Sequence, residues 1–291
     1  MLDYRASLIL VGVLGLGLGT PRDASAIITR HDVPDASYVV SDDDYPALVD
    51  LFGPGDCIGT LISSRHLLTV AHCAEELTTS SSLQVDGAAV GVEAVVLHPD
   101  YDGENHDIAV VRLAEEVEGA TPHALFEGSD EEGATLVLVG RGIHATATEG
   151  EPGGSTDGLL RRATNVVAST SDLWIEVLFE DPAGTAAITD LEGVGAAGDS
   201  GGPAFLETAD GLVLAGLNSF GEPPPGGEIG HYGASDFSTR VSRYVDWIES
   251  AYDAPGEDAA DCGCSAAAPP RGRLALFLGL AFALGRRRSA K

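Results

Sequence analysis

One serine of this sequence lies in a setting suited to covalent chemistry. Residues 198–203 read GDSGGP, so Ser200 is flanked by an acid and by glycines. A serine hydroxyl is a weak nucleophile at neutral pH, and it needs a histidine to take its proton and a carboxylate to orient that histidine. Upstream, His72 ends the run LTVAH and Asp107 begins the run DIAVV. These residues predict nucleophilic catalysis by Ser200, with His72 as proton shuttle and Asp107 as its orienting group.

The glycines around Ser200 have a chemical reason of their own. A tetrahedral oxyanion is stabilised by backbone N–H groups directed at one point, and side chains obstruct the backbone shapes that this requires. We expect the amides of Gly198 and Ser200 to be these donors.

Together these motifs resemble the trypsin/chymotrypsin family of serine proteases, in which His, Asp and Ser follow in this order. The resemblance covers residues 27–252 and includes a block in which Cys57 precedes GTLIS and His72-Cys73 closes the segment. It implies a disulfide between Cys57 and Cys73, which would close a loop of roughly 16 residues and stabilise the fold by about 3 kcal/mol. It also implies a serine endopeptidase that acts on proteins or peptides through an acyl-enzyme.

The G-x-S-x-G pattern at Ser200 also occurs in the nucleophile elbow of α/β-hydrolases. That fold places its Asp and His after the serine, whereas the only downstream histidine is His231, in a loop rich in Gly and Pro. Residues 193–197 are also too rich in glycine and alanine for the buried strand that precedes an elbow. The sequence therefore favours the protease.

Short apolar runs bounded by turn-forming residues indicate an all-β protein. They lie at residues 94–97, 108–111, 135–139, 173–177 and 212–215. The family resemblance implies two packed six-stranded Greek-key barrels of the chymotrypsin type, with His72 and Asp107 in the first and Ser200 in the second. Apolar residues at helical spacing predict one C-terminal α-helix over residues 241–249.

The charge balance excludes some partners. With 16 basic and 45 acidic residues the formal net charge is −29, so nucleic acid and anionic membrane surfaces are poor partners. No histidines and carboxylates show the spacing of a metal motif such as H-E-x-x-H, and we expect no metal and no other cofactor. A calcium loop stays open because acids are abundant, but residues 73–92 show too little ligand pattern to assign one.

The N-terminal residues 1–26 have the pattern of a secretory signal peptide: Arg5, an apolar stretch at 8–18 and the small residues ASA at 24–26. Cleavage would leave Ile27 first. In the resembled family a freed Ile or Val amine pairs with the aspartate before the nucleophile, here Asp199, and shapes the oxyanion hole. Signal peptidase itself would then produce the active N-terminus. The family's usual two glycines are replaced by Thr29-Arg30, so the alternative of a merely extended Ile27 stays open.

The C-terminal residues form an acidic linker with Cys262 and Cys264 (253–265) and a short apolar tail with a basic end (266–291). The apolar run at 274–284 is about half the roughly 20 residues that span a bilayer. The order of cysteine, apolar run and arginines resembles MYXO-CTERM sorting signals. It implies a secreted or cell-surface protein whose partners include export and tail-processing machinery, with membrane contact only through this tail. A short tilted anchor and a Cys262–Cys264 disulfide are the alternatives.

The resemblance also assigns a specificity pocket beside Ser200. Its floor would be Val194, where an aspartate gives preference for Arg or Lys, and its walls would be Gly195 and the segment Ser219-Phe220-Gly221. Asp236 aligns with a wall position that is normally glycine, so an acid there could restore attraction for a basic side chain. It could also face solvent or meet Arg240. Apolar, basic and broad pockets therefore all stay open.

One departure from the family pattern bears on the pocket, and one rival function stays open. Ala196 replaces a cysteine that the family usually has before the nucleophile loop, which predicts a more mobile pocket wall. The rival function is a catalytically silent, protease-shaped binding protein. The intact set of His72, Asp107 and Ser200 argues against that rival.

Overall fold

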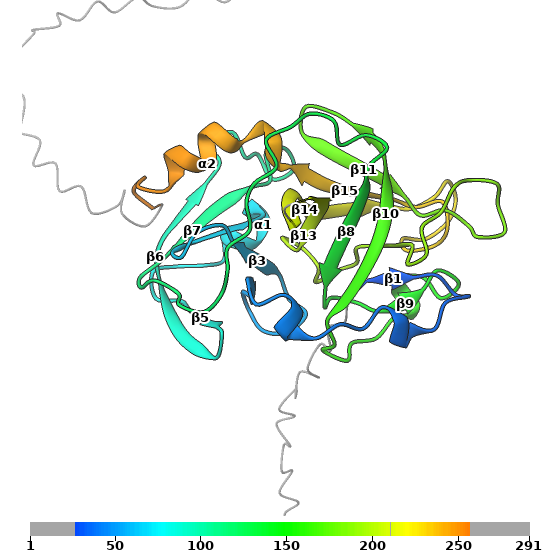
Figure 1. Cartoon of the computed structure of the whole chain (residues 1–291), viewed down its shortest axis with the longest axis horizontal. Helices are drawn as coiled ribbons and strands as arrows, with labels where there is room; N and C mark the ends of the chain where they lie inside the picture. The colour runs from blue at the N-terminus through cyan, green and yellow to red at the C-terminus, as the bar shows by residue number, and fades with distance from the viewer. Residues whose placement is uncertain (1–26, 210, 257–291) are drawn as a thin grey trace, which may run out of the picture. The chain divides into compact units, whose positions relative to one another are not determined.

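The computed structural model describes residues 27–209 and 211–256 (Figure 1). The predicted signal peptide (1–26) and the tail with Cys262 and Cys264 lie outside the described residues. None of the described helices is long and apolar enough to cross a membrane.

Six antiparallel strands form the N-terminal barrel. Their order is β2 (Leu48–Asp50), β3 (Ile58–Leu61), β4 (His66–Thr69), β7 (Ala109–Leu113), β6 (Ala88–Leu97) and β5 (Ser82–Val85). The end strands β2 and β5 contact each other, which curls the sheet round its core. Inward side chains alternate with exposed ones along β5, as the two-residue period of a half-buried strand requires.

The C-terminal barrel is closed and also has six strands (Figure 1). Their order is β10 (Arg161–Thr170), β11 (Trp174–Leu178), β15 (Ser235–Arg240), β14 (Gly211–Glu222), β13 (Pro203–Thr208) and β8 (Thr135–Gly140). Closure leaves no unpaired edge strand. The predicted all-β fold of two six-stranded barrels with a C-terminal helix is confirmed.

A third, small sheet was not foreseen from the sequence. Strand β1 (Ile28–Thr29) lies between β9 (Ala145–Thr146) and β12 (Gly193–Val194), parallel to the first and antiparallel to the second. Two-residue strands carry too little pattern to be recognised in a sequence. This sheet brings the first described residues of the chain to the loops that flank Ser200.

The helical segments are short. Helix α1 (Ala71–Ala74) carries His72, and 3₁₀ turns occupy Asp35–Ser37, Asp42–Asp44, Glu151–Gly153 and Val241–Arg243. The helix predicted over 241–249 divides into this last 3₁₀ turn and helix α2 (Val245–Ala251), because Tyr244 between them has a non-helical φ of −119°. Ile248 and Ala251 are the buried residues of α2.

One apolar core runs from the first barrel into the second. Leu67, Val110 and Val111 of the first barrel belong to the same buried cluster as Phe205 and Leu214 of the second. Because side chains from both barrels share this core, the loops between them are held at a fixed separation. The candidate site lies on these loops.

Candidate active site

His72 and Asp107 meet through two hydrogen bonds. His72 Nδ1 lies 2.8 Å from Asp107 Oδ2, and the His72 amide donates to Asp107 Oδ1 at 2.9 Å. Asp107 is only 3% exposed, whereas the His72 side chain is 36% exposed. The carboxylate thus orients the imidazole through its Nδ1 and leaves Nε2 available to accept a proton.

Two residues of the second barrel hold Asp107. The Ser219 hydroxyl donates to Asp107 Oδ2 at 2.6 Å, and the Thr239 hydroxyl donates to the Asp107 carbonyl at 2.8 Å. From the sequence, Ser219 was expected only in the pocket wall, and this use of its hydroxyl was not predicted. The available signal was the polar pair Asn218-Ser219, which follows the apolar run 212–217 within strand β14.

The predicted disulfide between Cys57 and Cys73 is present, with Cα atoms 6.1 Å apart. It fastens the residue after His72 to the start of β3. Cys57, Cys73 and His72 place possible metal-ligating atoms within 4.8 Å of one another. Because both sulfurs are in the disulfide, neither offers the thiolate that a metal binds.

Ser200 and His72 line one cavity of about 280 Å³, together with Gly198 and Phe52. Among the described residues, no hydrogen bond joins the Ser200 hydroxyl to His72. Such bonds are often long before substrate binds. The Ser200 carbonyl accepts from the Ile58 amide at 2.8 Å, which ties the serine loop to strand β3.

The backbone at Gly198 requires glycine. Its φ is +92°, and a Cβ there would lie 2.2 Å from the Gly55 carbonyl oxygen. Within the described parts of the chain, no group accepts a hydrogen bond from the amide of Gly198 or of Ser200. Both donors are therefore free to bind a ligand oxygen.

Asp199 is turned away from this cavity and is buried, at 1% exposure. It accepts from the Gly142 amide at 2.6 Å and from the amides of Ile27 and Ala196, each at 3.0 Å. Burial raises the pKa of this carboxyl to about 6 in spite of these three donors. The chain thus holds Ile27 N against a carboxylate that lacks a full counter-charge.

Ile27 itself adopts a strained backbone. Its φ is +60°, a region that β-branched residues occupy only under constraint. Its side chain is 1% exposed. A residue that begins a chain has no preceding carbonyl to clash with, so this strain exists only while a peptide bond precedes Ile27.

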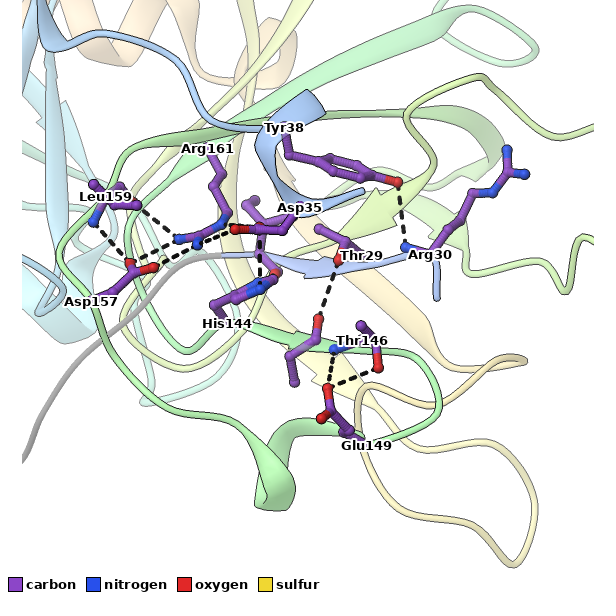
Figure 2. Close-up of polar contacts among 12 residues, drawn as sticks. Thr29, Arg30, Asp35, Tyr38, His144, Thr146, Glu149, Asp157, Leu159 and Arg161 are labelled. Carbon is purple, nitrogen blue, oxygen red and sulfur yellow. Dashed lines mark hydrogen bonds and ion pairs between the residues drawn. The ribbon is translucent and has the colours of Figure 1, made fainter. Parts of the chain in front are cut away.

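Thr29 and Arg30, in place of two glycines, are compatible with this arrangement. Thr29 is 1% exposed, and its hydroxyl donates to the Ala145 carbonyl at 3.4 Å. The Arg30 side chain points away from Thr29 (Figure 2). Its Nη1 lies 2.9 Å from the Thr189 carbonyl and its Nη2 lies 2.7 Å from Asp32. The departure from the family pattern therefore does not prevent β1 from pairing.

A second cavity, of about 240 Å³, adjoins Ser200. The structure brings most of the predicted pocket residues to it, together with several that the sequence analysis did not name. Its lining comprises Gly195, Ser200, Ser219, Phe220, Gly221 and Asp236, and also Glu151, Ala196, Ala197, Asn218 and Ile229. Val194 is not among the described residues of this lining, because it is buried in β12 with its backbone paired to Ile28.

Asp236 is the buried charge of this cavity. It is 4% exposed, and its Oδ2 accepts from the Gly195 amide at 2.9 Å and from Asn218 Nδ2 at 3.0 Å. Burial raises the pKa of Asp236 to about 7, and the negative charge of Asp199 adds to the rise. Arg240 pairs instead with Glu131, at 2.7 Å. Among the residues that the structure describes, no cationic side chain therefore pairs with Asp236.

Aromatic rings and a loop contact support the cavity walls. Phe220 stacks on Phe237 with ring centroids 4.7 Å apart and meets Trp174 edge-on at 5.0 Å. The Glu151 amide donates to the Ile229 carbonyl at 3.0 Å, which joins two loops that both line the cavity.

The chain is similar in sequence to known proteins. A family model described as Trypsin matches residues 38–248. Chymotrypsin-C of Bos taurus is 30% identical over 214 residues, which cover 66% of this chain and 76% of the relative. CLIP domain-containing serine protease B15 of Anopheles gambiae is 27% identical over 230 residues, covering 67% of this chain and 60% of the relative. The chain spans less than half the length of some other relatives.

A likeness to a solved structure concerns the fold. Neuropsin, a serine protease expressed in the limbic system of mouse brain, has a TM-score of 0.56 and 21% identity, over 74% of this chain and 98% of that chain.

Proposed function

Because this chain belongs to the trypsin family, whose members are serine proteases, we propose that it is a serine endopeptidase with His72, Asp107 and Ser200 as its catalytic residues. The observation that carries the proposal is the 2.8 Å contact of His72 Nδ1 with buried Asp107, beside a cavity that His72 shares with Ser200. The unpaired amides of Gly198 and Ser200 support it.

The reaction follows from these positions. Ser200 Oγ forms a bond to the scissile carbonyl carbon while His72 takes its proton, and Asp107 stabilises the resulting imidazolium. The amides of Gly198 and Ser200 hold the oxyanion. The C–N bond then breaks as His72 passes the proton to the leaving amine. Water releases the acyl group by the same steps, and the proton returns to Ser200.

The cavity at Asp236 indicates the substrate class. A buried carboxylate without a counter-charge is costly, and a ligand cation removes that cost. We infer that this pocket, with Gly195, Ser219, Phe220 and Gly221 as walls, takes an arginine or lysine side chain. Val194 would then lie behind the pocket.

The contact of Ile27 with Asp199 supports activation by a free N-terminus. Cleavage before Ile27 would remove the strain of its positive φ and would turn a neutral amide donor into an ammonium beside the buried carboxylate. Signal peptidase would make this cut, so no separate zymogen cleavage is needed. Secretion to the medium or cell surface, with later processing near Cys262 and Cys264, completes the proposal.

A fluorophosphonate probe tests the proposed enzyme without knowledge of its substrate. The processed protein is labelled beside a Ser200→Ala variant, with an intact Cys57–Cys73 disulfide verified in both. Labelling that disappears in Ser200→Ala is expected. Absence of labelling in the folded protein would favour a catalytically silent binding protein.

A further inference from the structure

His144 connects the first described residue of the chain to an ion-pair cluster around the buried Arg161, whose partners Asp35 and Asp157 are exposed. Its Nδ1 lies 3.2 Å from the carbonyl oxygen of Ile27. Its Nε2 lies 3.2 Å from Asp35 Oδ1, as Figure 2 shows. Both ring nitrogens therefore face acceptors. The side chain is 19% exposed, so protons reach it from solvent.

The cluster next to His144 consists of Arg161 and two carboxylates. Arg161 is fully buried and forms two bonds to Asp35, at 2.8 and 3.0 Å, and two to Asp157, at 2.9 and 2.6 Å (Figure 2). Arg161 belongs to strand β10 of the closed barrel. The backbone of His144 is also fixed, because it exchanges two hydrogen bonds with Ser155. His144 thus links a fixed part of the barrel to the Ile27 carbonyl.

Only a protonated imidazole can donate from both nitrogens. A neutral ring can satisfy either the Ile27 carbonyl or Asp35, but its other nitrogen then presents a lone pair to an oxygen. The charge on the ring consequently decides whether the link from Ile27 to Asp35 is complete.

Carboxyl groups from three segments of the chain lie near His144. Asp35 comes from the first 3₁₀ turn, Asp157 from the segment before β10, and Glu149 from the segment after β9. The pKa of each of these three carboxyls is lowered, in part by the positive charge of His144. Arg161 is the nearby cation of this cluster, and it is paired with Asp35 and Asp157. A freed Ile27 ammonium would face Asp199 rather than the ring.

We propose that His144 is a positioning residue which, when protonated, clamps the inserted N-terminus through the Ile27 carbonyl. The inference rests on the proposed activation by a free Ile27 amine. It adds that insertion is tighter on the acidic side of neutrality, where the Ile27 carbonyl and Asp35 both receive a hydrogen bond. Asp199 binds the amine of Ile27, and His144 binds the carbonyl oxygen of the same residue.

The test measures protection of the Ile27 amine rather than catalysis. A Ser200→Ala chain that begins at Ile27 is exposed to cyanate at pH 6 and pH 8, and carbamylation of the amine is followed by mass spectrometry. The rate for the free peptide Ile-Ile-Thr-Arg at each pH is the reference. Protection is the ratio of the two rates. His144→Gln keeps one donor but cannot become charged.

His231→Gln is the matched control. His231 also faces a backbone carbonyl, of Ala147 at 2.8 Å, and a carboxylate, of Glu228 at 3.9 Å, but it does not contact Ile27. Asp35→Asn serves as a second variant if His144→Gln fails to fold, because it removes the anion that attracts the second donor.

At pH 6 we expect protection of the Ile27 amine to be about tenfold greater in the parent chain than in His144→Gln, which corresponds to the free energy of one charge-assisted hydrogen bond. At pH 8 we expect the two chains to be equally protected. His231→Gln should behave as the parent. An equal difference at both pH values, or the same effect in His231→Gln, would overturn the role of His144. A parent chain that is no better protected than the peptide would overturn the insertion itself, whereas fluorophosphonate labelling reports on the peptidase separately.

Discussion

Two buried carboxylates of this molecule differ in whether the chain itself provides a partner for their charge. Asp199 and Asp236 are 1% and 4% exposed, and burial raises their pKa values to about 6 and about 7. Asp199 has Ile27 N beside it, so processing of the chain would supply its cation. Asp236 faces a cavity and has no described cation. We infer that the protein completes the first site itself and leaves the second to its substrate.

The largest effect is expected from removing the cation of Asp199. A chain that retains Ala26 cannot present an ammonium at Ile27 and keeps the strained φ there. We expect kcat/KM to fall about 100- to 1000-fold, the cost of a lost oxyanion donor. Steady-state kinetics of this chain and one that begins at Ile27 provide the measurement. Equal activities would show that Ile27 is merely an extended terminal residue.

The same pair of chains should differ in stability in a pH-dependent way. While Ile27 N is an amide, burial raises the pKa of Asp199 from 3.8 to about 6, so the folded chain loses stability as pH rises between these values. The total loss is about 3 kcal/mol. The ammonium removes this loss, and Asp236 affects both chains alike. Urea unfolding of Ser200→Ala forms should therefore show a larger advantage for the chain beginning at Ile27 at pH 7 than at pH 4.

Equal advantages at pH 4 and pH 7 would mean that the Ile27 amine does not pair with Asp199.

Removing the charge of Asp236 should alter selectivity rather than general activity. Loss of one partner of a buried charge pair typically costs about 2–5 kcal/mol. We therefore expect Asp236→Asn to lower kcat/KM for arginine at the scissile position at least about thirtyfold, with little change for leucine. Asp246→Asn, at an exposed position on helix α2, removes the same charge far from the cavity and is the control. A parallel fall for both substrates would argue against a pocket role.

The smallest effect concerns the pH dependence of cation binding. With a pKa of about 7, Asp236 is mostly neutral at lower pH and must lose a proton to pair with a cation. Affinity for benzamidinium should therefore increase as pH rises towards 7, by about tenfold per pH unit, and level off above it. Calorimetry on Ser200→Ala protein measures this without interference from turnover. A flat profile would mean that Asp236 does not contact the ligand.

The sequence predicted the fold and several elements of the site because their signals are local. Apolar runs between turn formers mark five of the barrel strands, β6, β7, β8, β11 and β14. Glycine at position 198 reflects a φ of +92° and close packing. The motif containing Ser200 needs no knowledge of distant segments. The Cys57–Cys73 pairing came from the family resemblance.

The remaining parts depend on contacts between distant segments. Ser219 reaches Asp107 across 112 positions, and His144 reaches Ile27 across 117. Neither spacing leaves a pattern in the sequence. The orientation of Asp236 could not be predicted for the same reason. Arg240 does not pair with Asp236 because it pairs with Glu131, which lies 109 positions earlier in the sequence.

The most direct test is to map cleavage sites in a library of peptides with the processed protein and its Ser200→Ala variant. Cleavage that requires Ser200 and follows arginine or lysine is the result we predict. Cleavage after apolar residues would contradict the role of Asp236, and no cleavage by the folded, disulfide-bonded protein would contradict the proposed peptidase.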